Sequence, residues 1–449
     1  MAQPQVLMIA YFFPPLGGAG VQRTVKFVKY LPGYGWDPLV LTVDAGTHIA
    51  YDPSMLNELP DNLPVYRTRA FDPEDLKGWW RGPFGQPGDS NAAPSTAPSS
   101  GTGHQRRWKT DLAHLYLRLI PWVCVPDRKV GWLPYACQMG RSVLSQRRID
   151  LLFSTSSPIT SHLIALRLKQ TSGIPWVADF RDLWVSFPGH KPVTPLHGLI
   201  ERVIERRIVT TADRVIANTE AARRVLLRDY PSVVPDRVVT IPNGFDEADF
   251  TGLQARQEDA RFILTYTGNF YGNRNPRTLF HALTRLFTLR PDLRGRITVR
   301  FIGPGDPSLD ATVRQHHLND TVEIWPYQPH RKSLEALASS DVLLLIDAPE
   351  FNVNIPGKVF EYLRAGQPIL ALVPEGATAD LLRETGGAMI VHPEDITAIA
   401  DALLTLYDRR RTRPPEAIPN QAVVARFERR QLTGRLAEVF DQAYRRPPA

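Results

Sequence analysis

The sequence predicts two doubly wound α/β domains that face each other across a cleft. Its 449 residues are too many for one ordinary core, and two domains of about 200 residues each are the natural division. Short apolar runs rich in β-branched residues alternate with helical patterns, and the alternation starts again after residue 258. An apolar content of 43% and a charged content of 22% are typical of globular proteins and exclude disorder of the whole chain.

The first domain is expected over residues 1–240. Several of its candidate strands are apolar almost throughout, as in strands buried on both faces of a parallel sheet, and they lie at residues 6–12, 38–43, 65–69, 151–155, 176–180, 214–218 and 238–242. Helical patterns separate them, for example at residues 21–31, 160–170 and 197–210. This alternation predicts a Rossmann-like domain. Residues 82–105, dominated by Gly, Pro, Ser, Ala and Thr, are expected to form a disordered insertion.

A second Rossmann-like domain is expected over residues 259–412, after a hinge at residues 241–258. Its candidate strands are again short and apolar, at residues 262–268, 297–303, 322–325, 342–346, 368–373 and 388–391. Helical patterns lie between them, at residues 276–289, 309–317, 333–339, 358–365, 378–385 and 396–408. Residues 423–444, which follow a Pro-rich linker, have the pattern of an amphipathic helix.

The net charge of +7, from 53 Lys and Arg against 46 Asp and Glu, favours anionic partners such as nucleotide phosphates or anionic lipid. A solubilising excess spread over the surface is an equal alternative. No nucleic-acid-binding motif occurs, so no such partner is expected. Cys124 and Cys137 have neither metal-ligand nor disulfide-framework spacing, which fits a reducing cytosol. The N-terminus lacks the features of a signal peptide, and no apolar run approaches the roughly 20 residues that span a bilayer.

A glycine-rich segment with Gly17, Gly18 and Gly20 lies between the first strand and the first helix. Glycines let the backbone turn tightly and come close to a ligand. The helix N-terminus behind them offers N–H groups to an anion. The spacing differs from the dinucleotide fingerprint, which argues against NAD. The segment therefore indicates an anion-binding loop, with a plain strand-to-helix turn as the alternative.

Charged residues follow the strand at residues 176–180, at the edge of the sheet where α/β folds bind ligands. Arg181 is expected to neutralise a phosphate or to orient an acceptor. Asp179 or Asp182 is expected to accept a proton or to hold an acceptor hydroxyl. An internal Arg–Asp ion pair that fixes the loop is the alternative.

Two further turns are candidates for the cleft. Asn243 and Gly244 give a strong turn signal between the two Rossmann patterns, so this turn is expected to be the hinge, with its backbone along the cleft. Gly268 and Asn269 follow the first strand of the second domain, and Arg274 lies just before the next helix. An arginine there can grip a diphosphate in bidentate fashion, and a solvated surface arginine is the alternative.

The most informative segment covers residues 354–368. Lys358 and Glu361 are three residues apart, so they share one face of a helix near its start. Lys358 can neutralise a phosphate, and the Glu361 carboxylate can accept both hydroxyls of a ribose. These charges fit a nucleotide diphosphate better than a bare anion, and a surface ion pair is the alternative.

Together these motifs resemble the family 4 retaining glycosyltransferases of the two-Rossmann GT-B fold, also described as glycosyl transferases group 1. The resemblance covers nearly the whole chain and includes the sequence Phe-Ile-Gly-Pro-Gly at residues 301–305. It implies a hexosyltransferase-type enzyme whose second domain holds the nucleotide-sugar donor and whose first domain holds the acceptor. It also implies that the final helix crosses back to the first domain.

The resemblance assigns roles to individual residues. Glu361 matches the family's ribose-binding glutamate, and Arg274 stands where the family has a lysine beside the diphosphate. Val353 departs from the pattern, because many members have a glutamate there that contacts the sugar. The region of Asp179 departs as well, since many members carry a histidine there. The expected catalytic residues are Arg274, Lys358, Asp179 and Arg181, and the expected donor-binding residues are Gly17, Gly18, Asn243, Gly268, Asn269, Asn354 and Glu361.

The implied reaction is transfer of a sugar from a nucleotide-diphosphate sugar to an acceptor hydroxyl with retention, in cell-surface polysaccharide or glycolipid biosynthesis. No cofactor is expected, and no metal, because no Asp-x-Asp constellation follows a strand. A nucleotide-sugar epimerase of the same fold and a catalytically silent nucleotide-sugar-binding scaffold remain alternatives, and Val353 favours the latter.

The basic, Trp-containing stretch at residues 106–148 indicates either peripheral contact with an anionic membrane that carries a lipid-linked acceptor, or core packing of its aromatic side chains. The expected location is the cytoplasm, at the inner face of the plasma membrane where such contact is made.

Overall fold

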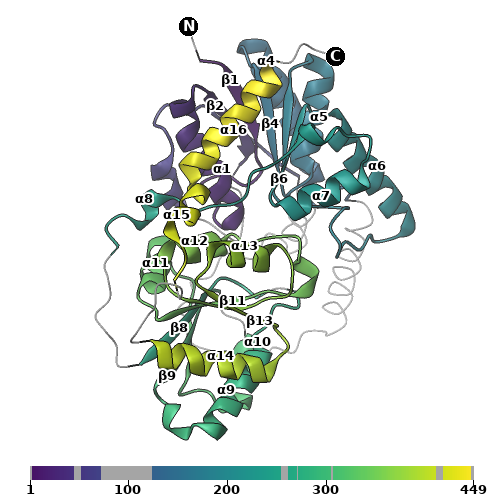
Figure 1. Cartoon of the computed structure of the whole chain (residues 1–449). Coiled ribbons are helices and arrows are strands. Elements are labelled where there is room, and N and C mark those ends of the chain that lie inside the picture. Colours follow the sequence, from purple (N-terminus) through teal and green to yellow (C-terminus); the bar gives the residue numbers. More distant parts are fainter. Residues whose placement is uncertain are drawn as a thin grey trace, which may run out of the picture.

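The computed structural model describes residues 3–44, 52–71, 124–253, 261–270, 272–304, 307–410 and 418–445. It contains two α/β domains, each with a parallel sheet between helices, and the C-terminal helix lies along the first domain (Figure 1). The predicted fold class is therefore confirmed. The predicted insertion at residues 82–105 lies outside the described residues, as do residues 254–258 of the predicted hinge and residues 106–123 of the basic stretch.

Within the described residues, the first sheet has seven parallel strands in the order β3-β2-β1-β4-β5-β6-β7. They are β1 (Gln5–Ile9), β2 (Asp37–Val43), β3 (Val65–Thr68), β4 (Leu151–Ser156), β5 (Trp176–Phe180), β6 (Arg214–Ala217) and β7 (Val238–Thr240). The helices of this domain include α1 (Ala19–Tyr30), α4 (Leu133–Gln146), α5 (Thr160–Ser172), α6 (Pro195–Thr211) and α7 (Glu220–Asp229). The strand order reverses between β1 and β4, which is where such sheets bind ligands at the carboxyl ends of their strands.

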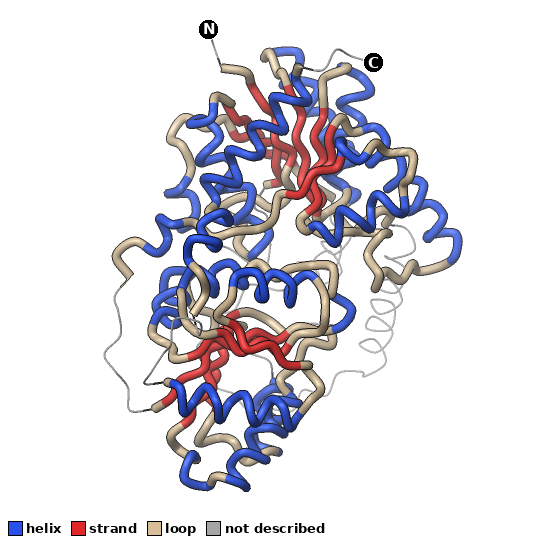
Figure 2. Tube along the Cα trace, in the orientation of Figure 1, coloured by secondary structure: helices blue, strands red, loops and turns tan. Residues whose placement is uncertain are grey.

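The second sheet repeats this plan, with six described strands in the order β10-β9-β8-β11-β12-β13, all parallel. They are β8 (Phe262–Thr267), β9 (Ile297–Ile302), β10 (Val322–Trp325), β11 (Val342–Ile346), β12 (Ile369–Leu372) and β13 (Ala388–Val391). The helices include α9 (Arg277–Leu289), α10 (Pro307–Gln315), α11 (His330–Ala338), α12 (Lys358–Ala365), α13 (Ala377–Thr385) and α14 (Ile396–Arg409). Here the strand order reverses between β8 and β11, so a second ligand position is expected there. Figure 2 shows the strands of both sheets enclosed by helices.

Local sequence signals set several helix ends. The side chains of Thr194, Thr219 and Asp395 each accept a hydrogen bond from a backbone N–H of the first turn that follows, and so begin α6, α7 and α14. Gly366 ends α12 in the left-handed region, at a φ of 74°, where a side chain would be strained. None of the described helices combines the length and the apolar character that crossing a bilayer requires.

The C-terminal segment differs from the single helix predicted over residues 423–444. A short helix α15 (Gln421–Val424) and a 3-10 turn (Ala425–Phe427) precede α16 (Arg429–Tyr444), and the Glu428 side chain caps α16 by accepting from the N–H of Gln431. This interruption redirects the chain from the second domain to the first. On α16, Leu432, Leu436 and Phe440 are buried in the core of the first domain, and the Phe440 ring packs edge-on against Trp36 at a centroid distance of 5.3 Å.

The carboxyl ends of the two sheets meet each other. Thr219, which follows β6, donates from Oγ1 to the carbonyl oxygen of Val353, which follows β11, at 2.6 Å. The rings of Phe187, after β5, and Phe351, after β11, have centroids 6.0 Å apart. The two positions at which ligands are expected therefore face each other between the domains.

Candidate active site

The structure gathers the predicted residues of the second domain around the switch point between β8 and β11. Gly268 follows β8, Arg274 precedes α9, and Lys358 and Glu361 lie in the first turn of α12. These segments are distant in sequence, and parallel strand pairing brings them together.

Arg274 is held rigidly at the end of β11. Its side chain is 5% exposed, and Nε donates to Oδ1 of Asp347 at 2.7 Å. The guanidinium carbon lies 4.1 Å from the centroid of the Phe351 ring, a cation–π contact. Burial raises the pKa of the Asp347 carboxyl even though Arg274 stabilises its charge. Arg274 is therefore a fixed cation and not the solvated surface arginine of the alternative.

Lys358 approaches the same point from α12. Its Nζ lies 3.7 Å from the centroid of the Tyr266 ring, and a methyl group at Gly268 would come within 3.1 Å of Nζ. Gly268 also has a φ of 105°, a backbone conformation that strains any other residue, so this position favours glycine. Burial, together with the positive charge of Arg274, lowers the pKa of Lys358 to about 7.

The carboxylates near Lys358 are already engaged, since Asp347 pairs with Arg274 and Glu361 pairs with His330. Among the described residues, no carboxylate forms an ion pair with Lys358. Two cations therefore lie close together, and the charge of Asp347 balances only one of them. Such a site favours a multiply charged anion.

Glu361 has a partner that sequence reasoning missed. Its Oε1 lies 2.9 Å from Nε2 of His330, the first residue of α11, and its side chain is 18% exposed. Burial opposes the charged form of His330, but the hydrogen bond and charge of Glu361 and the charge of Asp249 outweigh it and raise the pKa. The partly exposed carboxylate is thus oriented by His330 and is not the i,i+3 partner of Lys358.

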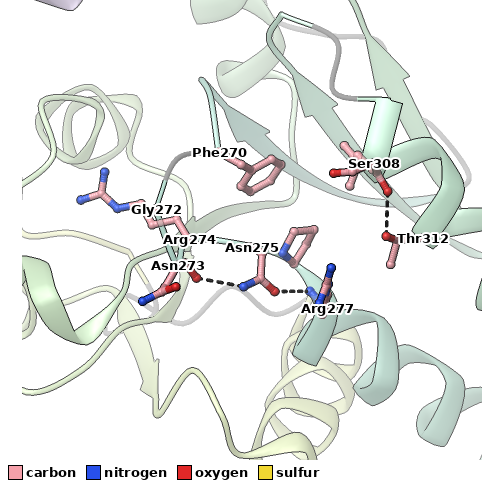
Figure 3. A pocket seen from close by; sticks show the side chains of 10 residues that line it. Phe270, Gly272, Asn273, Arg274, Asn275, Arg277, Ser308 and Thr312 are labelled. Carbon is pink, nitrogen blue, oxygen red and sulfur yellow. Dashed lines mark hydrogen bonds between the residues drawn. The ribbon is translucent and has the colours of Figure 1, made fainter. Parts of the chain in front are cut away.

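Two hollows flank this cluster in the second domain. The first, of about 330 Å³, lies between the loop before α9 and the start of α10, and its lining includes Asn273, Asn275, Arg277 and Thr312. Figure 3 shows the side chains of Arg274 and Arg277 pointing in opposite directions, so that only Arg277 is directed towards α10. The second hollow, of about 230 Å³, opens at the ends of β8, β9 and β10 and is lined by residues that include Gly268, Asn269, Gly303 and Trp325.

In the first domain, the glycine-rich loop and Arg181 are brought together. Gly17 and Gly18 precede α1, and Gly18 is exposed with a φ of 98°. Arg181 donates from Nη1 to the carbonyl oxygen of Gly20 at 2.8 Å. A methyl group at Gly20 would lie 3.0 Å from the same Nη1, so a side chain there would displace the arginine.

Contrary to the prediction, Asp179 does not face the ligand crevice but lies in the interior of the first domain. Its side chain is fully buried, and its Oδ1 and Oδ2 accept from Nη2 and Nε of Arg23 at 2.9 and 3.0 Å. Oδ2 also accepts from Oγ1 of Thr155 at 2.8 Å. A carboxylate saturated in this way is not placed to take a proton from an acceptor, so the ion-pair alternative describes Asp179. Nothing in the residues around Asp179 indicated that its partner would be Arg23.

Arg23 also explains where the hinge begins. It donates to the carbonyl oxygens of Ile241 and Pro242 at 2.9 and 2.7 Å, and its Nη1 lies 3.5 Å from Oδ1 of Asn243. The strand predicted at residues 238–242 therefore ends at Thr240, because the next two carbonyl groups bond to Arg23. Asn243 lies in the hinge turn, where its N–H donates to Oδ1 of Asn218 at 3.0 Å.

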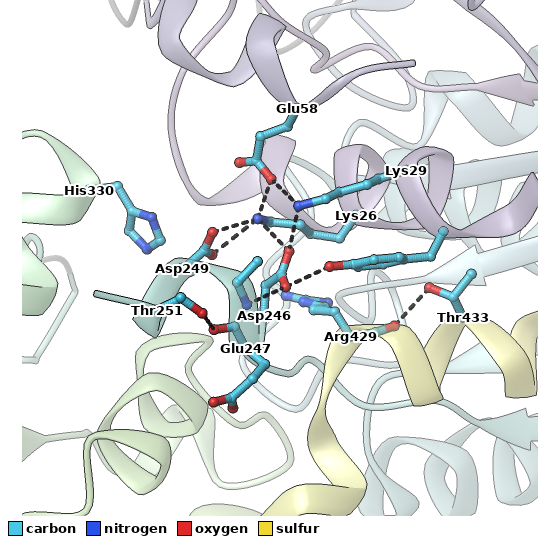
Figure 4. Close-up of polar contacts among 12 residues, drawn as sticks. Lys26, Lys29, Glu58, Asp246, Glu247, Asp249, Thr251, His330, Arg429 and Thr433 are labelled. Atoms are coloured by element: carbon cyan, nitrogen blue, oxygen red, sulfur yellow. Dashed lines mark hydrogen bonds and ion pairs between the residues drawn. The ribbon is translucent and has the colours of Figure 1, made fainter. Parts of the chain in front are cut away.

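A charged cluster continues from the hinge to α1 (Figure 4). Within the described residues, Glu58, Asp246 and Asp249 gather closely enough to hold an ion, but the Nζ of Lys26 pairs with all three of them. Burial disfavours the charge of Asp246, yet its bonds to Lys26 lower the pKa to about 2. The cluster is therefore an ion-pair network that ties the hinge helix α8 (Glu247–Phe250) and its cap to the first domain.

Val353 supplies no polar group to the cleft. Its side chain is 8% exposed and packs with the core of the first domain, while its carbonyl oxygen accepts from Thr219. At this position, an interdomain contact replaces the carboxylate that the resemblance implied.

Known proteins show the same two-part organisation. Residues 18–244 match the model of the glycosyl transferase 4-like domain, and residues 261–409 match that of the glycosyl transferases group 1. The D-inositol 3-phosphate glycosyltransferase of Kineococcus radiotolerans is 29% identical over 55% of this chain and 60% of its own length. The enzyme of that name from Saccharomonospora viridis is 26% identical over 54% of this chain and 58% of its own length. The chain thus spans about three fifths of the length of these relatives.

Solved structures share the fold over almost the whole chain. Anabaena HepE in complex with UDP and glucose has a TM-score of 0.61 at 15% identity, with 98% of this chain and 100% of that chain covered. Sucrose-phosphate synthase from Thermosynechococcus elongatus has a TM-score of 0.62 at 15% identity, with 98% of both chains covered. The first family model alone covers just over half of the sequence. The chain belongs to the GT-B glycosyltransferases that combine a glycosyl transferase 4-like domain with a group 1 domain.

Proposed function

We propose that this protein transfers a hexose from a nucleotide-diphosphate sugar to an acceptor hydroxyl, with retention of anomeric configuration. The observation that carries the proposal is the pair of neighbouring cations, Arg274 before α9 and Lys358 on α12, with the oriented carboxylate of Glu361 one helical turn beyond Lys358. A diphosphate supplies the negative charge that the cations lack, and a ribose supplies two hydroxyls for the carboxylate. Relatives named as glycosyltransferases support this assignment.

The donor would lie along the carboxyl edge of the second sheet. The hollow lined by Gly268, Asn269 and Trp325 suits the base, because it adjoins Lys358 through Gly268 and has aromatic side chains in its lining. Asn354, four residues before the start of α12, remains a proposed contact of the sugar. HepE, which shares this fold, was solved with UDP-glucose, and a uridine nucleotide is accordingly the first donor to test.

Departure of the nucleotide diphosphate develops negative charge, and fixed cations stabilise such charge without reorganising. Arg274 and Lys358 would do this from the second domain. Gly17, Gly18 and the N-terminus of α1 would approach the phosphates from the first domain. We therefore propose that the reaction requires no metal, and that the departing phosphate helps to deprotonate the acceptor on the same face of the sugar.

The acceptor would enter from the first domain. Arg181 is the cation best placed for it, since it contacts the first turn of α1 at Gly20 and begins the segment that reaches Phe351 through Phe187. The relatives are named for D-inositol 3-phosphate, which supports a small polar acceptor, and a lipid-linked acceptor is our own proposal. We propose a role in glycolipid or cell-surface polysaccharide synthesis, in the cytoplasm at the membrane surface.

One observation favours a second candidate, a silent nucleotide-sugar-binding scaffold. Val353 is an apolar interdomain contact where a sugar-binding carboxylate was implied. Such a scaffold would bind the donor and release no nucleotide. Measuring nucleotide release as well as binding separates the two candidates.

Removal of the Glu361 carboxylate is expected to abolish nucleotide recognition. In a thermal-shift screen of UDP, GDP, ADP, dTDP and CMP, with and without Mg²⁺, one diphosphate at 100 times its dissociation constant should stabilise the protein by about 2.7 kcal/mol. Glu361→Ala should remove this shift, because the ribose hydroxyls lose their acceptor.

Glu375→Ala is the matched control, since among the described residues this exposed carboxylate, just before α13, forms an ion pair with Arg383 alone, in the last turn of that helix. It should retain the full shift. A diphosphate shift that is unchanged in Glu361→Ala would contradict the assignment of the ribose site, and a shift that requires Mg²⁺ would contradict the metal-free proposal.

Nucleotide binding is expected to take up a proton at alkaline pH. Burial and Arg274 hold the pKa of Lys358 near 7 in the free protein, and a bound diphosphate favours the ammonium form. Binding is therefore strongest below pH 7, and affinity should fall by up to about tenfold per pH unit above it, until the pKa of the complex is reached. Calorimetry at about pH 8, in buffers of different ionisation enthalpy, measures the uptake. Lys358→Met should show none, and equal uptake in both proteins would assign the proton to another group.

A further inference from the structure

Helix α6 (Pro195–Thr211) exposes an apolar stripe. Leu196, Leu199, Ile200 and Val203 follow the spacing i, i+3, i+4 and i+7, so they lie on one face of the helix. Their side chains are 63, 62, 41 and 57% exposed, respectively. Figure 1 shows α6 on the outer side of the first domain, at the right of the view and away from α16.

The two acidic residues of α6 face the protein interior, whereas acidic residues of a surface helix usually face the solvent. Its acidic residues, Glu201 and Glu205, are buried. Glu205 accepts hydrogen bonds from the N–H and hydroxyl of Ser186 and from the hydroxyl of Tyr230, and Glu201 pairs with His190 at 2.8 Å. The carboxylates thus fasten the helix to the protein and contribute no negative charge to the outer face.

The outer face carries only positive charge. Arg202, Arg206 and Arg207 are exposed on α6, and Lys191 is exposed just before it. In the part of the chain that the structure describes, none of the three arginines has an ion-pair partner. Arg207 follows Val203 by one turn on the stripe, and Arg202 and Arg206 lie beside it.

We propose that α6 docks in the plane of an anionic phospholipid membrane, with Leu196, Leu199, Ile200 and Val203 inserted among the acyl chains. An apolar stripe flanked by arginines, without exposed acid, matches the chemistry of that surface. A protein partner would need acidic residues arranged around an apolar groove, whereas an anionic bilayer presents both features everywhere. The choice of this occupant therefore follows from the charge of the face.

Docking through α6 would also orient the cleft. The segment that leads into α6 begins at Arg181, beside the first turn of α1, and Phe187 within it contacts Phe351 of the second domain. A bilayer bound to α6 would lie next to the acceptor side of the cleft. This extends the proposed function by naming the surface that reaches a lipid-linked acceptor, but nucleotide binding does not depend on it.

Co-sedimentation of the full chain with vesicles tests the proposal. The protein is expected to bind vesicles of phosphatidylcholine with phosphatidylglycerol, and to bind phosphatidylcholine alone much more weakly. Leu199→Asp with Val203→Asp should lower the partition coefficient at least tenfold, because charge replaces the inserted side chains. Each arginine should contribute about fivefold to the partition coefficient. Replacing Arg202, Arg206 and Arg207 together by Gln should therefore lower it about a hundredfold, and high salt should lower the partition coefficient of the wild type by a similar factor.

Leu289→Asp is the matched control, because Leu289 is 65% exposed on α9 of the second domain. It should bind vesicles as the wild type does. The thermal shift with nucleotide, measured on every variant, shows that the donor site is intact, so that failure of the membrane proposal and failure of the proposed function are told apart.

Three results would overturn the proposal. Equal vesicle binding by the wild type and the α6 variants would assign membrane contact to another surface. Absence of vesicle binding, together with a dimer that the α6 variants abolish, would assign the face to a second copy of the chain. Absence of vesicle binding, together with a marked fall in melting temperature for the α6 variants, would show that another segment of this chain covers the face.

Discussion

Replacing Lys358 by alanine is expected to lower turnover by about 10²- to 10³-fold, because one preorganised cation at the leaving diphosphate is lost. The pKa of about 7 shows how unfavourable the free ammonium is in its buried position. That cost is relieved when the diphosphate carries its full charge, so the interaction strengthens as the glycosidic bond breaks. The effect should therefore fall mainly on kcat and less on the affinity for the donor.

The measurement is release of nucleoside diphosphate from the donor that the nucleotide screen selects. Lys332→Ala is the control, since Lys332 is an exposed lysine on α11 that pairs with Glu335 at 3.1 Å. It should leave turnover unchanged. Arg274→Ala is expected to reduce turnover similarly, with lower stability as well, because Asp347 would remain buried without its partner. Near-wild-type turnover in both Lys358→Ala and Arg274→Ala would end the assignment of these cations to the reaction.

The fold could be predicted because its signals are local. A parallel strand buried on both faces is apolar along its length, and a helix beside it repeats its apolar residues every three or four positions, so both elements can be recognised within ten residues. The ends of strands and helices were less predictable where a residue distant in sequence determines them. The strand before the hinge stops at Thr240 because Arg23 bonds to the next two carbonyl groups, and Arg23 is 218 residues from Ile241.

The same distinction holds for the site. Gly268, Arg274, Lys358 and Glu361 follow strand ends or begin helices, and the topology of a parallel sheet places such positions together. Their partners could not be found in this way. His330 bonds to Glu361 from 31 residues away, and nothing in the sequence around it indicates a nucleotide site.

Asp179 shows why residue type and position do not define a role. It stands at a strand end, as a catalytic base would, but its carboxylate is satisfied by Arg23, which is 156 residues away in sequence. Val353 is a comparable case. Its contact with Thr219 crosses the cleft, and only the folded chain shows that this position joins the domains.

Replacing Asp179 by asparagine is therefore expected to destabilise the protein by about 3–5 kcal/mol, because it leaves the guanidinium of Arg23 buried without a counter-charge. Arg23 is 1% exposed, so water cannot replace the lost carboxylate. The loss should also loosen the hinge, since the same guanidinium holds the carbonyl groups of Ile241 and Pro242. Denaturant unfolding followed by fluorescence measures the change.

Asp182→Asn is the comparison, because the Asp182 side chain is 46% exposed and bonds only loosely to Arg181, at 3.4 Å. It should change the free energy of unfolding by less than about 0.5 kcal/mol. Removing both members of the pair, as in Arg23→Met with Asp179→Leu, should recover part of the stability, since no charge then remains buried. If Asp179→Asn instead kept full stability and lost turnover, the carboxylate would act on the substrate, and the buried pair with Arg23 would be a resting arrangement that the acceptor displaces.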